Sequence, residues 1–64
     1  MNRTEKDHAV YLLALSYRRY DDANPDVGMG WSDNYFVDHA LTALNFTKDD
    51  VNYHSIITRM KETK

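Results

Sequence analysis

The chain has 64 residues, no cysteine and a formal net charge of −2 at pH 7. A chain of this length forms at most one small domain, residues 1–64, and the missing cysteine excludes disulfides and thiolate zinc sites. Stability must then come from helix packing, an oxygen-ligated metal or a second chain.

The first helix is predicted over residues 5–20. Thr4 is a suitable N-cap, and Asp7 three residues later gives a shortened capping box. Arg18 and Arg19 would lie in the last turn, where positive charge suits the helix dipole. A segment that contains one proline and two glycines follows, and these residues prevent the helix from continuing.

The apolar run AVYLLAL, residues 9–15, puts apolar side chains on every side of this helix. A helix that is apolar all round is normally buried all round, and two short helices do not easily enclose it. We therefore expect a homodimer, the commonest oligomer, with Tyr11, Leu12 and Leu15 at the dimer interface. The alternative is a monomer in which three loop residues cover the helix as a lid: Val27, Met29 and Trp31.

The second helix is predicted over residues 33–44. Ser32 is a suitable N-cap, and Trp31 before it can pack against Phe36 as a hydrophobic staple. Asn45 is a suitable C-terminal stop, because asparagine tolerates the left-handed backbone conformation that ends many helices.

The third helix is predicted over residues 48–61. Thr47 caps it, Asp50 completes a capping box, and Phe46 with Val51 forms a second staple. Apolar residues do not alternate over any useful length, so no strand is expected. The fold class is therefore all-α, a small domain of three helices with a long loop at 21–31.

That loop lies in an acidic part of the chain. Residues 20–47 carry five aspartates and no lysine or arginine. One interpretation is a long turn, since asparagine, proline and glycine all favour turns. The other is a surface for a protein partner, with aspartates that steer a basic partner and an apolar tip that supplies buried contact. The residues of this expected partner-binding surface are Asp21, Asp22, Asp26, Met29 and Trp31.

A calcium-binding loop of the EF-hand type is a minor alternative over residues 22–33. Three oxygen-bearing side chains match its first, third and fifth positions, and Asp33 falls at the twelfth. However, the sixth position needs glycine and is Val27, and Asp33 is shorter than the usual glutamate. The three matching residues are Asp22, Asn24 and Asp26.

DNA binding is the second alternative, through a helix-turn-helix in which helix 48–61 enters a groove. Lys48, Asn52, Ser55 and Arg59 would face the DNA. Against this, the chain is acidic, and affinity for DNA depends on cationic contacts.

No sequence motif indicates catalysis. The three histidines fall one in each predicted helix, without the spacing of a metal-binding pair. We therefore expect no catalytic residue, no metal site and no cofactor. The apolar run is too short to span a bilayer and lacks the features of a signal peptide, so we expect a cytoplasmic protein that does not bind membranes. The favoured function is a small non-enzymatic interaction or regulatory accessory protein.

Overall fold

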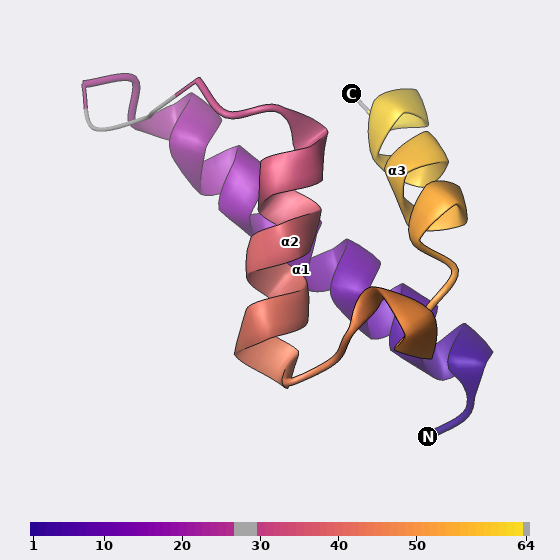
Figure 1. Ribbon diagram of the computed structural model, residues 1–64. Helices are drawn as coiled ribbons and strands as arrows, with labels where there is room; N and C mark the ends of the chain where they lie inside the picture. Colours follow the sequence, from indigo (N-terminus) through magenta and orange to yellow (C-terminus); the bar gives the residue numbers. More distant parts are fainter. Residues whose placement is uncertain (27–29, 64) are drawn as a thin grey trace.

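The computed structural model describes residues 1–26 and 30–63, and these residues form helices and no strand. α1 spans Arg3–Ala23, α2 spans Asp33–Leu44, a short 3-10 turn η1 spans Lys48–Asp50, and α3 spans Tyr53–Glu62. α1 runs the length of the molecule, and α2 and α3 both pack across it (Figure 1). The prediction of an all-α fold with three helices is confirmed.

α1 begins earlier than predicted. Its N-cap is Asn2, whose side chain accepts a hydrogen bond from the Glu5 backbone N–H (2.8 Å), while the Glu5 carboxylate accepts from the Asn2 N–H (3.2 Å). The expected cap at Thr4 is therefore wrong, and Asp7 does not complete a box. Instead, Asp7 Oδ1 accepts from the backbone N–H of Asn52, 45 residues away (2.8 Å).

α1 also ends later than predicted, at Ala23. Asn24 follows it as the C-cap, directly before Pro25. A residue before proline avoids the helical conformation, which explains the stop. Arg18 and Arg19 consequently lie before the last turn, which contains no basic residue.

The core lies between the three helices. α2 and α3 each turn one apolar stripe toward α1, and Val51 joins them from the segment before α3. The buried residues are Val10, Ala14, Leu15, Phe36, Val37, Ala40, Leu41, Val51, Ile56, Ile57 and Met60.

The apolar run 9–15 is largely enclosed by its own chain. Val10, Ala14 and Leu15 are buried, and Tyr11 and Leu13 pack against the core. Only Leu12 is an exposed large apolar side chain, at 50%. The premise that two partner helices cannot enclose this run is therefore corrected.

The segment between α2 and α3 ends one helix and starts another within eight residues. Asn45 adopts the left-handed conformation (φ 59°, ψ 40°) that stops α2, as predicted. Thr47 and Asp50 form the predicted capping box, in which the Thr47 N–H donates to Asp50 Oδ2 (2.8 Å). This hydrogen bond lowers the pKa of the Asp50 carboxyl below its ordinary value of 3.8.

The predicted third helix 48–61 is interrupted. After η1 the backbone becomes extended at Val51, and Asn52 then caps α3 by accepting from the Ser55 N–H (3.4 Å). Contacts with α1 stabilise the break. The Arg3 guanidinium donates to the Val51 carbonyl oxygen (3.4 Å) and to that of Asp49 (3.1 Å), while Val51 is buried in the core.

Arg18 connects the three helices. Its Nη1 lies 3.2 Å from Asp33 Oδ1 at the start of α2 and 2.6 Å from the Met60 carbonyl oxygen in α3. Its Nη2 donates to the carbonyl oxygen of Thr63, the C-cap of α3 (2.5 Å). Positive charge at a helix C-terminus is favourable, so Arg18 also supports α3 electrostatically. No helix within the described ranges is long and apolar enough to cross a membrane.

Candidate functional site

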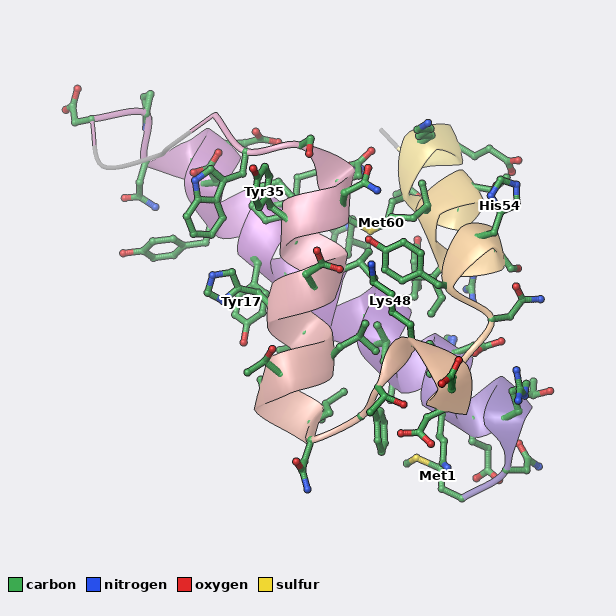
Figure 2. All side chains as sticks on the ribbon, viewed as in Figure 1. Met1, Tyr17, Tyr35, Lys48, His54 and Met60 are labelled. Carbon is green, nitrogen blue, oxygen red and sulfur yellow. The ribbon has the colours of Figure 1, made fainter. Side chains whose placement is uncertain are left out.

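Four side chains of α1, α2 and the segment before α2 form a connected group of rings, which we call the aromatic surface: Tyr17, Trp31, Tyr35 and His39. The Trp31 indole stacks on the His39 imidazole, with ring centroids 4.9 Å apart and an angle of 16° between the planes. Trp31 also contacts Tyr35 (5.9 Å), and Tyr17 meets His39 edge-on (6.0 Å). Figure 2 shows Tyr17 and Tyr35 on the side of α2 away from α3.

Phe36 attaches the aromatic surface to the core. Its ring centroid lies 6.2 Å from that of Trp31, which confirms the predicted staple, and Phe36 itself is only 4% exposed. Trp31 nevertheless remains 38% exposed, and Tyr35 is 59% exposed. The aromatic surface thus packs on the core through Phe36 and exposes its outer side to solvent.

Trp31, Tyr35 and His39 are spaced four residues apart, which places them along one side of a helix and its entry turn. The sequence predicts Trp31 at the surface and paired with Phe36, but its contacts with Tyr35 and His39, and the neighbouring Tyr17, were not predicted. The four-residue spacing was the available signal for the first two. Tyr17 could not be found this way, because the packing of α1 on α2 brings it to the group.

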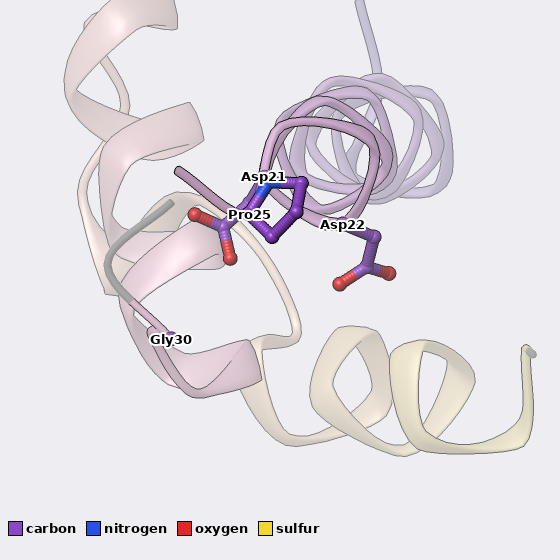
Figure 3. Close-up of a pocket in the computed structure, with 4 residues that line it drawn as sticks. All are labelled: Asp21, Asp22, Pro25 and Gly30. Atoms are coloured by element: carbon purple, nitrogen blue, oxygen red, sulfur yellow. The ribbon is translucent and has the colours of Figure 1, made fainter. Parts of the chain in front are cut away.

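Acidic residues lie beside the aromatic surface, where α1 ends. Asp21, in the last turn, is half-buried, while Asp22 and Asp26 are exposed. A hollow of about 340 Å³ is lined by Asp21, Asp22, Pro25 and Gly30, and Gly30 directly precedes Trp31 (Figure 3). The C-terminus of a helix carries partial negative charge, and no basic residue in the last turn offsets it. This end of the molecule therefore favours positive charge.

Of the five residues expected to bind a partner, the structure thus places four in one region. Asp21, Asp22 and Asp26 lie at the end of α1, and Trp31 begins the aromatic surface. Met29 lies outside the described residues, as does Val27 of the alternative lid.

The three residues expected at a dimer interface are not equivalent. Leu15 is 6% exposed and belongs to the core of its own chain, so its assignment to a free face is corrected. The Tyr11 hydroxyl lies 2.7 Å from Thr63 Oγ1, and the Arg59 guanidinium lies over the Tyr11 ring at 4.0 Å. Only Leu12 is available on the outer side of α1.

The geometry gives no support to a calcium loop over residues 22–33. Asp22 is part of α1, and Asp33 is paired with Arg18. The Asn24 side chain donates to the Tyr20 carbonyl oxygen (2.8 Å), so it serves the end of α1. Residues 1–26 and 30–63 contain no group of three or more histidine or acidic side chains that could hold a metal.

A helix-turn-helix is also poorly matched. Eight residues, including η1, separate α2 from α3, where that motif has a turn of three or four. Lys48 lies outside α3 and over the Tyr53 ring (4.6 Å), and Asn52 is the α3 N-cap. The Tyr53 side chain also contacts α2. Its burial, together with the hydrogen bond that its hydroxyl donates to Asp38 (2.9 Å), raises the pKa of Tyr53.

Comparison with family models, curated proteins and solved structures found no match for this chain. Its function therefore has to be inferred from the chemistry of its surface.

Proposed function

We propose that this protein is a small non-enzymatic interaction protein that binds another protein through the aromatic surface and the neighbouring aspartates. The observation that carries the proposal is Trp31, which stays 38% exposed although three neighbouring rings contact it. Tryptophan and tyrosine are enriched at protein interfaces because each buries a large area at a small cost in side-chain entropy.

The aromatic surface is preorganised for binding. Stacking on His39 and contact with the buried Phe36 restrict the Trp31 side chain before any partner arrives. Binding of a partner therefore costs less conformational entropy than binding to a mobile surface would.

The aspartates add selectivity for charge. Residues 20–47 carry five aspartates and no lysine or arginine, so this part of the chain attracts positively charged proteins and repels nucleic acid. We propose a regulatory or accessory role on this basis. The absence of cysteine is consistent with the reducing cytoplasm, where we also place the protein.

The test is retention of partners from an extract of the source cells by immobilised protein. A Trp31→Ala/Tyr35→Ala double variant should lose partners that the wild type retains, because both exposed rings are removed. His54→Ala is the matched control, since it removes an exposed ring on α3, away from the aromatic surface (Figure 2). Circular dichroism should show both variants to be folded. Identical retention by all three proteins would overturn the proposal.

A further inference from the structure

We infer that the group recognised by this surface is an arginine side chain of the partner, whose guanidinium stacks on Trp31 or Tyr35 and pairs with the neighbouring aspartates. This inference rests on the proposed function and specifies its partner. It follows from the lysine and arginine side chains that lie over other aromatic rings of this chain, and from the contacts of Arg18.

Among the described residues, three aromatic rings outside this surface lie under the chain's own cations, with the cation 4.0–5.5 Å from the ring centroid. A cation over an aromatic face is attracted by the negative charge of the π-system. The three pairs are Lys6 with Phe46, Lys48 with Tyr53, and Arg59 with Tyr11.

The aromatic surface differs in this respect. Over the described parts of the chain, no lysine or arginine lies over Tyr17, Trp31 or Tyr35. The cation nearest in sequence to Tyr17, Arg18, is occupied by Asp33 and two carbonyl oxygens of α3 and its cap. A partner can therefore supply the cation that this chain does not.

The surroundings strengthen the attraction for a cation. The hollow at the end of α1 is lined by Asp21, Asp22, Pro25 and Gly30, and Gly30 directly precedes Trp31 in the sequence. The C-terminus of α1 adds partial negative charge there. A positive group at this end of the molecule is therefore attracted by carboxylates as well as by the exposed rings.

Arginine fits this combination better than lysine. Its planar guanidinium can stack face to face on a ring while the N–H groups in its plane donate to a carboxylate. The ammonium of lysine is compact and strongly hydrated, so it must lose more water to reach a ring. A nucleic acid base could stack on Trp31 as well, but its phosphates would lie beside the aspartates of residues 20–47.

The test uses three short peptides that differ only at two positions, which hold arginine, lysine or citrulline. Trp31 is the only tryptophan, so its indole N–H gives one NMR signal that reports on this surface alone. We expect the arginine peptide to shift this signal and to bind at least about threefold more tightly than the lysine peptide. Citrulline has a similar shape without the charge and should not bind.

Variants then locate the charge that matters. Asp22→Asn/Asp26→Asn should weaken binding of the arginine peptide at least about threefold. Asp49→Asn, an exposed aspartate in η1 outside this region, should leave it unchanged.

The outcomes separate this inference from the proposed function. Equal affinity for the arginine and lysine peptides, no binding of either, or stronger binding of a single-stranded oligonucleotide would overturn the arginine assignment. The interaction function would survive the first two results if the Trp31→Ala/Tyr35→Ala variant still lost partners that His54→Ala retained.

Discussion

Arg18 Nη1 lies 3.2 Å from Asp33 Oδ1, and this ion pair joins the C-terminal half of α1 to the first residue of α2. Both side chains are mostly buried, with 16% and 21% of their surface exposed. The same guanidinium donates to the carbonyl oxygens of Met60 and Thr63. One side chain thus satisfies polar groups of the other two helices at one place.

Replacement of Arg18 should therefore destabilise the whole fold. We expect Arg18→Met to lower the free energy of unfolding by about 2–3 kcal/mol, because Asp33 and two carbonyl oxygens lose a charged donor. Urea denaturation followed by circular dichroism measures this. Arg19→Met is the control, since Arg19 is exposed, and should cost less than about 0.5 kcal/mol. Equal losses in the two variants would contradict the linking role of Arg18.

Asn45 should tolerate glycine better than alanine. Its φ of 59° lies in the left-handed region, which alanine adopts at a cost of about 1 kcal/mol and glycine adopts freely. Asn45→Ala should lower the free energy of unfolding by that amount, whereas Asn45→Gly should be close to the wild type. Thermal denaturation of the three proteins in parallel makes the comparison, and the reverse order would exclude this backbone explanation.

Asp50 should give the protein an acid-sensitive component of stability. Because its pKa is lowered in the folded state, the carboxylate contributes stability above its ordinary pKa of 3.8, and this contribution is lost as pH falls through the lowered value. Asp50→Asn should therefore melt at a lower temperature than the wild type at about pH 6, with a difference that shrinks toward about pH 2. Asp49→Asn is the control, because Asp49 does not belong to the capping box. If its melting temperature changed with pH in the same way, the capping role of Asp50 would not be the cause.

We propose that self-association, if it uses α1, involves the exposed side chain of Leu12. Leu12→Glu should keep the fold and weaken any dimer, because this side chain is on the outer side of α1. Leu15→Glu should instead unfold the chain, at a cost of at least about 3 kcal/mol, because it would bury a charge. Sedimentation equilibrium with circular dichroism distinguishes the two effects. A dimer unaffected by Leu12→Glu would have to form through another surface.

Local signals in the sequence predicted much of the fold. The stop at Asn45, the Thr47–Asp50 capping box and the Trp31–Phe36 staple depend on residues at most five apart, and all three are present. The end of α1 also depends on a local signal, Asn24 before Pro25, and was predicted three residues too early. The other failures occur where distant residues decide. Asn2 and Thr4 are both suitable caps by residue type. The structure uses Asn2, so α1 includes Arg3, whose side chain donates to the carbonyl oxygens of Asp49 and Val51 far along the chain.

The candidate site shows the same division. The exposure of Trp31 and the acidity beside it follow from composition and from its place before a helix. That Tyr17 and His39 meet depends on how α1 and α2 cross, which no spacing within one helix specifies. Which residues of the apolar run 9–15 are buried was not predicted for the same reason. It depends on α3 and its C-cap, which lie against the side of α1 that holds Tyr11.

The contacts between Tyr11 and Thr63, and between Asp7 and Asn52, span 52 and 45 residues of the chain. During synthesis α1 leaves the ribosome before the residues that complete these two contacts. Neither contact can form until α3 has emerged, and until then α1 depends on its own capping box to stay helical.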